Sequence, residues 1–189
     1  MEFVALSEED GLSDYEDGIL GMWSGNVSGY DNTEMLMPGL VTDSTITEEI
    51  FSFYMTGLSE TSYIDFGTID SSVVTDSSDI TWISIESENY WWTNKVTGFR
   101  WGDDWSDDTE YAIPELEGFT DTGTSCISGP SASINSFMGT ILNTSGSTET
   151  DDSWDYIFNC SDKDDMPSFE LLFGDFWMKV TPEDYIVDL

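Results

Sequence analysis

Asp121-Thr122-Gly123-Thr124-Ser125 is the stretch of this 189-residue sequence that decides its fold. It follows the segment 113–120 and precedes Ile-Ser-Gly-Pro at positions 127–130. A glycine allows a tight turn, and the flanking hydroxyl groups can donate hydrogen bonds to a carboxylate. The pattern therefore predicts an acid fixed in a hydrogen-bonded pocket. Taken alone, it also fits an ordinary surface turn of an acidic protein.

The composition around this stretch is strongly acidic and rich in aromatic residues. The chain has 39 Asp and Glu residues against four Lys and Arg, a net charge of -35 at pH 7, and 14% of its residues are aromatic. The aromatic content argues for a folded chain, and the charge repels phosphates and anionic membranes, so we expect no nucleic-acid partner. Self-repulsion should ease where carboxylates are protonated or salt is high, as in an acidic compartment or a saline habitat.

Signals for membranes, export and modification are weak. No run of about 18 apolar residues occurs, so we expect no membrane span, and residues 1–10 lack the features of a signal peptide. Asn26, Asn143 and Asn159 begin Asn-X-Ser/Thr triplets, which are candidate N-glycosylation sites and also arise by chance in a Ser- and Thr-rich chain. The two cysteines, Cys126 and Cys160, are too few to define a disulfide scaffold.

Short segments of mixed apolar and polar residues predict a mainly β chain. The expected strands are residues 50–55, 63–69, 80–85, 90–99, 169–173 and 176–180. Gly174-Asp175 separates the last two and predicts a tight hairpin turn.

Two helices and one long loop are also expected. Residues 130–142 predict a helix because Ile134, Phe137, Met138 and Ile141 fall on one face. Residues 33–40 predict a short helical turn, and the Ser-, Thr- and Asp-rich segment 143–153 predicts a surface loop.

Seven segments follow one another in a specific order. They are Ala-Leu-Ser-Glu at 5–8 with Asp-Gly-Ile-Leu-Gly at 17–21, Ile-Phe-Ser-Phe-Tyr at 50–54, Phe-Gly-Thr-Ile-Asp-Ser at 66–71, Ile-Thr-Trp-Ile-Ser-Ile at 80–85, Asn-Tyr-Trp at 89–91, residues 121–130, and Cys160 with Met-Pro-Ser-Phe at 166–169 and Pro-Glu-Asp-Tyr-Ile at 182–186. In this order they resemble the pepsin and cathepsin D family of aspartic proteases. The resemblance implies an all-β, pepsin-like bilobal fold with a few short helices, in which residues 1–39 are the end of the N-terminal lobe. Residues 40–189 would be the interlobe strand and the C-terminal lobe without its final strands.

The resemblance also implies a chemistry. In that family, a water held between two aspartates, one from each lobe, attacks the peptide carbonyl. The pair shares one proton because two like charges about 3 Å apart cannot both ionise, a rule drawn from aspartic proteases themselves. Asp121 would be the catalytic aspartate of the C-terminal lobe. The supporting residues implied by the resemblance are Thr122 and Ser125 for the active-site loop, Gly123 and Thr124 for the substrate backbone, and Tyr54 for a side-chain pocket.

The first Asp-Thr-Gly motif of the family and its flap tyrosine have no counterpart in this sequence, and Asp17 lies where the family does not use it catalytically. We therefore expect this chain to hold half of a catalytic pair and to be inactive alone. The missing N-terminal lobe and C-terminal strands would come from the same precursor or from another subunit. The resemblance implies no cofactor and no metal.

Three features depart from the family pattern. Cys160 matches a family cysteine whose partner has no counterpart here, and Cys126 replaces an apolar residue, so we expect it to be a small buried thiol rather than a reactive one. The sequence does not exclude a disulfide between Cys126 and Cys160, although the geometry of the family disfavours it. Residues 101–108 mix Trp with Asp, which favours a hairpin with a solvated tip over a contact surface for a partner chain or glycan.

Three functions fit these observations. The first is an acid-pH endopeptidase that cleaves peptide substrates between bulky apolar residues. The second is a non-catalytic, protease-like structural or binding component of an extracellular assembly. The third, a homodimer with Asp121 from each copy, fits least well because the chain spans an interlobe stretch. The expected location is outside the cell or in an acidic, lysosome- or vacuole-like compartment, where N-glycans could be attached.

Overall fold

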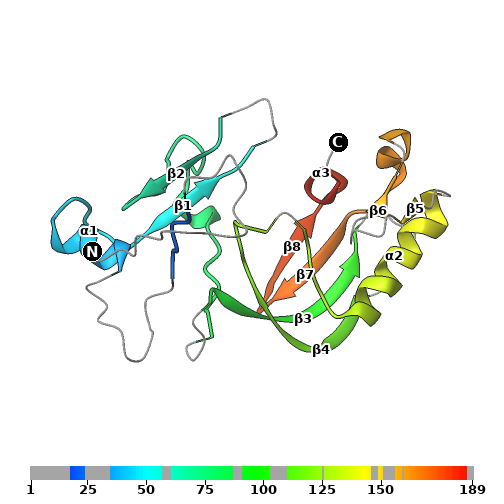
Figure 1. Cartoon of the computed structure of the whole chain (residues 1–189). Helices are drawn as coiled ribbons and strands as arrows, with labels where there is room; N and C mark the ends of the chain where they lie inside the picture. Colours follow the sequence, from blue (N-terminus) through cyan, green and yellow to red (C-terminus); the bar gives the residue numbers. More distant parts are fainter. Residues whose placement is uncertain are drawn as a thin grey trace. The chain divides into compact units, whose positions relative to one another are not determined.

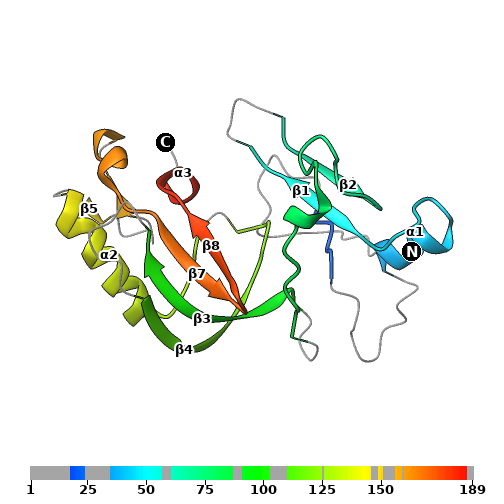
Figure 2. The same ribbon diagram turned by 180° about the vertical axis from the view of Figure 1, so that it is seen from behind.

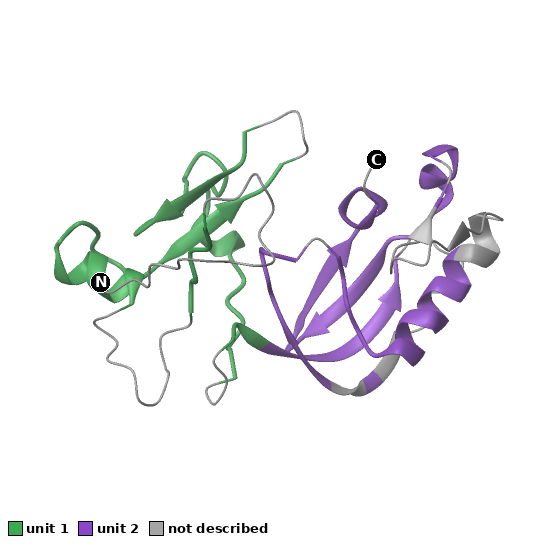
Figure 3. Ribbon diagram, in the orientation of Figure 1, with its two compact units in different colours: residues 1–93 green, residues 94–189 purple. Residues whose placement is uncertain are grey.

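The structure is a computed structural model, and it describes residues 18–23, 35–56, 61–86, 91–102, 110–124, 126–145, 149–150, 156–158 and 160–186. The described residues are mainly β with a few short helices, as the sequence predicts (Figure 1). The chain divides into two compact units, Met1–Thr93 and Asn94–Leu189 (Figure 3). The expected lobe boundary between residues 39 and 40 stays a prediction.

Within its described residues, the first unit contains one small sheet. Its elements are α1 (Leu36–Thr42), β1 (Phe51–Tyr54), β2 (Tyr63–Phe66) and the 3-10 turn η2 (Ser77–Asp79). β1 and β2 pair antiparallel with Phe51 opposite Phe66 and Tyr54 opposite Tyr63. The Phe51 ring packs edge-on against Trp92 at 5.3 Å. These elements confirm the strands expected near residues 50–55 and 63–69 and the helical turn expected near 33–40.

A glycine directly after β2 closes this small sheet. Gly67 has φ of 77°, and its amide donates to the Ile50 carbonyl at 2.6 Å. A Cβ at position 67 would lie 2.6 Å from the Cβ of Ile46. Glycine is therefore required here both by its backbone conformation and by the space available.

The prediction of a strand at residues 80–85 is wrong. This segment follows η2 and joins no sheet in the described part of the chain. Trp82 is 72% exposed. Its aromatic and β-branched residues suit a strand, but a strand also needs a neighbouring strand, and no described strand pairs with this segment.

The second unit is built on a four-stranded sheet with the order β4-β3-β7-β8. The strands are β3 (Thr93–Trp101), β4 (Glu110–Phe119), β7 (Phe169–Phe173) and β8 (Phe176–Val180). β7 and β8 form the expected antiparallel hairpin, and Gly174 in its turn has φ of 58°. β3 and β4 are neighbours in this sheet. Residues 103–109, which include most of the hairpin expected at residues 101–108, lie outside the described residues, so that hairpin stays a prediction.

Helix α2 (Ser131–Ser145) packs on one face of this sheet (Figure 2). The buried core consists of Trp101, Ile141, Met166, Phe169 and Val180. The Phe137 ring stacks on Trp101 at 5.2 Å and meets Phe169 edge-on at 5.0 Å. The apolar face expected of residues 130–142 is therefore the face that α2 turns toward the core.

The prediction of a surface loop at residues 143–153 is wrong in part. α2 continues to Ser145, and Glu149–Thr150 forms a short strand, β5, that pairs antiparallel with β6 (Tyr156–Ile157). The chain then continues through the 3-10 helix η3 (Cys160–Asp165) and ends its described part with α3 (Pro182–Tyr185). Ser and Thr are poor helix formers in isolation, but the packing of α2 on the sheet carries the helix past them.

The opposite face of the sheet holds an ion pair. Arg100 on β3 pairs with Glu170 on β7, and the guanidinium carbon of Arg100 lies 4.3 Å from the ring centre of Trp177 on β8. The indole ring and the carboxylate together fix the guanidinium across three strands.

Replacing Ile141 with alanine tests the core of the second unit. Ile141 is 1% exposed, so Ile141→Ala should lower the free energy of unfolding of this unit by about 2–5 kcal/mol through lost burial and a residual cavity. Ile127→Ala is the matched control, because Ile127 is 57% exposed and should change stability by less than about 0.5 kcal/mol. Native-state hydrogen exchange at β7 amides in increasing urea measures both, and equal effects of the two variants would contradict the assigned core.

Candidate active site

Asp121 lies in the connection between β4 and α2, two residues beyond Phe119. Both of its carboxylate oxygens accept hydrogen bonds from the turn that follows. The Gly123 amide donates to Oδ1 at 2.8 Å, and the Thr124 hydroxyl donates to Oδ2 at 2.6 Å. A backbone bond from the Thr124 amide to the Asp121 carbonyl, at 3.4 Å, closes the turn.

Steric crowding explains why position 123 is a glycine. A Cβ there would lie 3.2 Å from Oδ1 of Asp121, closer than most real contacts of this kind. Without a side chain, the Gly123 amide can approach the carboxylate directly. The sequence Asp-Thr-Gly-Thr thus folds locally around its own acid.

These hydrogen bonds lower the pKa of the Asp121 carboxyl below its usual range. The Thr124 hydroxyl is the larger cause and the Gly123 amide the second, while partial desolvation acts in the opposite direction. Donors to the ionised form favour it. The bonds therefore stabilise the folded turn at pH values above the ordinary aspartate range, and this contribution is lost as the pH falls through the lowered pKa.

An ionised, solvent-accessible carboxylate can accept a proton from water. No charged neighbour contributes to the pKa shift of Asp121, so the described residues do not supply a second acid to share a proton with it. They also contain no group of three or more acidic or cysteine side chains placed to hold a metal ion.

The structure brings together three of the predicted site residues, Asp121, Gly123 and Thr124. It adds a contact that the sequence reasoning missed, since the Thr124 hydroxyl donates to the carboxylate, while the expected contact of Thr124 with a substrate backbone stays a prediction. The spacing of a hydroxyl residue three positions after an aspartate is the signal that could have indicated this contact. Thr122 is exposed and, within the described part of the chain, makes no hydrogen bond to Asp121, and Ser125 lies outside the described residues.

Tyr54 belongs to the first unit, on β1. Its ring lies 5.1 Å from Tyr63, and both rings line a small cavity of about 70 Å³. The Tyr63 hydroxyl donates to Oδ2 of Asp70 at 2.6 Å, and this bond is the main reason that the pKa of Tyr63 rises to about 12. The same bond lowers the pKa of Asp70, with help from the Ser72 amide at 2.7 Å. The sequence reasoning missed this pair.

The cysteines differ from expectation. Cys126 is exposed rather than buried, because it follows the Asp121 turn in an exposed stretch before α2 that no described helix or strand covers. Cys160 is also exposed, and no disulfide joins described residues. Among the glycosylation candidates, Asn143 falls within α2, while Asn26 and Asn159 lie outside the described residues.

Comparisons with known proteins agree on one family. The family model for eukaryotic aspartyl protease matches residues 2–188. The chain is 27% identical to gastricsin of Oryctolagus cuniculus, covering 96% of this chain and 47% of the relative. It is 27% identical to pepsin-3 of the same organism, over 91% and 41%, and 26% identical to pepsin A of Bos taurus, over 90% and 43%. The chain thus spans somewhat less than half the length of these curated relatives.

A membrane span is not found in the part of the chain that the structure describes, since none of its helices is both long and apolar enough to cross a bilayer.

The hydroxyl of Thr124 can be removed without changing the shape of the side chain. Thr124→Val should raise the pKa of Asp121, because the larger of the two hydrogen bonds that favour the ionised carboxylate is lost. The control is Thr122→Val, whose hydroxyl does not bond to Asp121 among the described residues and should leave that pKa unchanged. A ¹³C NMR titration of the Asp121 carboxyl measures both variants. An unchanged pKa in Thr124→Val would refute the turn geometry.

Proposed function

The chain belongs to the eukaryotic aspartyl protease family, and from that premise we propose that it supplies one of the two catalytic aspartates of a pepsin-like, acid-pH endopeptidase. The observation that carries the proposal is the turn 121–124, in which Asp121 is exposed to solvent and has both carboxylate oxygens hydrogen-bonded. Such a turn holds an ionised carboxylate in a fixed position, where it can contact a bound water or a peptide substrate.

The lowered pKa of Asp121 supports a role for it as the ionised member of the pair. When two carboxyl groups share a site, one ionises readily and the other holds the proton. Asp121, already biased toward ionisation by Thr124 and Gly123, would be the ionised member and would accept a proton from the bound water. The oxygen of that water then adds to the peptide carbonyl, whose oxygen takes the proton of the partner acid. Asp121 then gives that proton to the amide nitrogen, while the partner carboxylate takes a hydroxyl proton from the diol, so that the C–N bond breaks, the carbonyl reforms and both acids return to their starting states.

The same turn limits how Gly123 and Thr124 can contact a substrate. The Gly123 amide and the Thr124 hydroxyl proton are already directed at Asp121. The lone pairs of the Thr124 hydroxyl stay available, since a hydroxyl donates one hydrogen bond and accepts two. Thr124 would therefore accept a bond from a substrate amide. Thr122 and Ser125 as loop supports, and Tyr54 as part of a side-chain pocket, stay proposals based on the family.

A second polypeptide segment, from the same precursor or another subunit, would provide the other aspartate and further strands. Two observations support this. The described residues of the first unit form a single two-stranded sheet, an arrangement that is marginal in water, and Met55 beside it is 70% exposed. In the second unit β8 is an outer strand of the described sheet, and Phe176 and Met178 on it are exposed, as suits an edge that another strand covers.

An extracellular or acidic location follows as part of the proposal. The net charge of -35 favours a medium in which carboxylates are partly protonated. Asn26, Asn143 and Asn159 would be available to N-glycosylation on that route.

The alternative is a non-catalytic, protease-like structural or binding component. The observation that favours it is that no second acid contributes to the environment of Asp121 in the described chain. The two functions differ in whether Asp121 is needed for peptide hydrolysis.

Activity after alanine substitution separates these functions. The chain would be co-expressed with the polypeptide that carries a second Asp-Thr/Ser-Gly motif, and hydrolysis of a denatured protein would be followed at acid pH. Asp121→Ala should reduce the rate by about 10³-fold or more, and pepstatin should block the unsubstituted protein. Asp175→Ala, in the β7–β8 turn, is the matched control and should keep full activity. Proteolysis that survives Asp121→Ala, or an assembled complex without acid proteolysis, would leave only the non-catalytic alternative.

Hydrogen exchange tests the proposed second polypeptide. In the 189-residue chain alone, amides of β1 and β2 should exchange at least about tenfold faster than those of β7, because the small sheet has few buried contacts. Adding the second polypeptide should slow exchange in β1 and β2 while β7 changes little. Strong protection of β1 and β2 in the chain alone would show that this sheet needs no further strands.

A further inference from the structure

Two tyrosines of the first unit are direct neighbours across the small sheet. Tyr54 on β1 pairs with Tyr63 on β2 in the register of the sheet, and their ring centres lie 5.1 Å apart with 32° between the ring planes. Residues directly opposite each other in an antiparallel pair have Cβ atoms about 4.5–5.5 Å apart. A covalent bond between the two rings would therefore need rotation of the side chains but no change of register.

A carboxylate holds the hydroxyl of one of these tyrosines. The Tyr63 hydroxyl donates to Oδ2 of Asp70 at 2.6 Å, and the Ser72 amide donates to Oδ1 of the same carboxylate at 2.7 Å. A hydrogen bond from a phenol to a carboxylate is short and strong. A base at this distance can take the hydroxyl proton in the same step in which the ring loses an electron.

The pair is also open to small reactants. Tyr54 is 37% exposed, and Tyr54, Tyr63 and Asp70 line the same cavity of about 70 Å³. An oxidant can therefore act on Tyr54 from solvent while Tyr63 stays bonded to its proton acceptor.

Tyr185 in the second unit has a different environment. Its hydroxyl donates to the Pro167 carbonyl at 2.8 Å, and a carbonyl is a much weaker proton acceptor than a carboxylate. Its ring packs against Phe137 and Phe169, which have no phenolic hydroxyl. Tyr185 is therefore a natural comparison for the Tyr54–Tyr63 pair.

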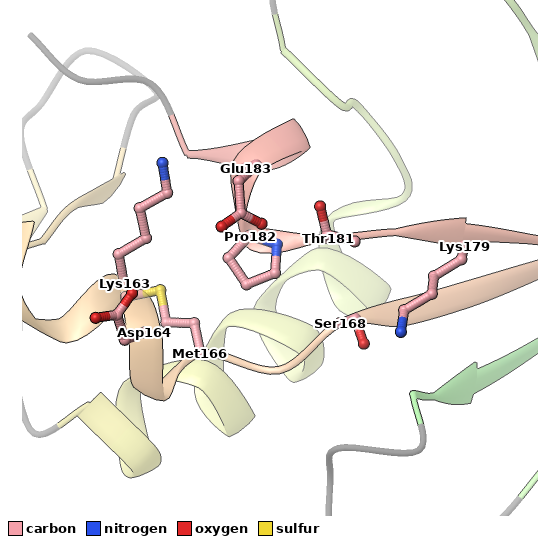
Figure 4. Close-up of a pocket in the computed structure, with 8 residues that line it drawn as sticks. All are labelled: Lys163, Asp164, Met166, Ser168, Lys179, Thr181, Pro182 and Glu183. Carbon is pink, nitrogen blue, oxygen red and sulfur yellow. The ribbon is translucent and has the colours of Figure 1, made fainter.

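The larger hollow of the second unit, of about 230 Å³, does not offer a reactive set of this kind (Figure 4). Among the described residues that line it, Lys163 and Lys179 are balanced by Asp164 and Glu183. The two lysine side chains lie on opposite sides of Pro182. This lining therefore has no excess of charge that would select a ligand.

We propose that Tyr54 and Tyr63 form an oxidation site at which the two rings become joined by a carbon–carbon bond, with Asp70 as the proton acceptor for Tyr63. The oxidant is a peroxide activated by a haem peroxidase. The new bond would fasten β1 to β2, since a two-stranded sheet by itself is marginal in water. The proposal does not rest on peptide hydrolysis, and none of these residues belongs to the Asp121 turn.

The reaction balances as a two-electron oxidation. Each phenol loses one electron and its hydroxyl proton, which goes to Asp70 from Tyr63 and to water from Tyr54. The two phenoxyl radicals couple through a ring carbon beside each oxygen-bearing carbon. The hydrogens on those two carbons then move as protons to the phenolic oxygens, which restores both aromatic rings. One molecule of hydrogen peroxide takes up the two electrons and two protons and leaves as two waters.

Peptide mapping after oxidation tests the proposal. The 189-residue chain would be treated at low concentration with hydrogen peroxide and a haem peroxidase, and then digested with a protease that cleaves after glutamate. Glu60 lies between the two tyrosines in the sequence, so cleavage there separates them unless their rings are bonded. The monomer should yield the two peptides joined, lighter than their sum by two hydrogen atoms. Oxidation of Met55, which is 70% exposed, adds oxygen and joins no peptides.

Substitutions identify the groups that take part. Tyr54→Phe and Tyr63→Phe should each abolish the joined peptides, and Tyr185→Phe is the control that should leave their yield unchanged. Asp70→Asn should lower the initial rate at least about tenfold because the proton acceptor is lost, and Asp70→Glu should restore part of the rate. Asp65→Asn makes the same change of charge in the same cavity and should change the rate far less. Unchanged amide NMR shifts of β1 and β2 establish that the sheet of each variant is intact.

Three results would overturn the proposal. The first is coupling of the unsubstituted chain only between separate molecules or only at other tyrosines. The second is survival of the joined peptides in Tyr63→Phe. The third is an equal loss of rate in Asp65→Asn and Asp70→Asn. If Asp70→Asn loses the sheet, the unsubstituted chain and the three tyrosine variants still decide whether this pair is the site of coupling.

Discussion

The packing of the Phe137 ring, stacked on Trp101 and edge-on to Phe169, is the contact on which the candidate site depends. It holds α2 on the sheet, and the connection between β4 and α2 is the segment that carries Asp121. One end of that connection leaves a strand of the sheet, and the other enters the helix packed on it. An exposed turn with few contacts of its own is thereby given two fixed ends, while its internal hydrogen bonds to Asp121 fix the carboxylate.

The pKa shifts of the acidic residues are caused by neighbouring hydrogen-bond donors, although the chain has a net charge of -35. Short hydrogen bonds within a turn lower the pKa of Asp121, and a similar arrangement with Tyr63 and the Ser72 amide lowers that of Asp70. Each carboxylate is stabilised by neutral donors a few residues away rather than by a basic partner, as suits a chain with only four basic residues.

Much of the fold could be predicted where the residues of a single helix or hairpin are enough to indicate its structure. The β7–β8 hairpin follows from two apolar runs around Gly174, and α2 follows from the spacing of Phe137 and Ile141. Predictions failed where a distant neighbour decides the outcome. Residues 80–85 have strand-like residues but no described strand to pair with, and Cys126 lies in an exposed stretch that no described helix or strand covers. At the site, the motif identified Asp121, but only the folded turn shows that Thr124 bonds to its carboxylate.

The central claim is that Asp121 is one half of a proton-sharing pair whose other half lies outside this chain. The most direct measurement is the ¹³C titration of the Asp121 carboxyl in the chain alone and in its complex with the polypeptide that carries the second Asp-Thr/Ser-Gly motif. Coupled acids titrate in two macroscopic steps that belong to the pair. The account predicts one step at a pKa below the usual aspartate range in the chain alone and two separated steps in the complex. A single, unchanged step in both would contradict it.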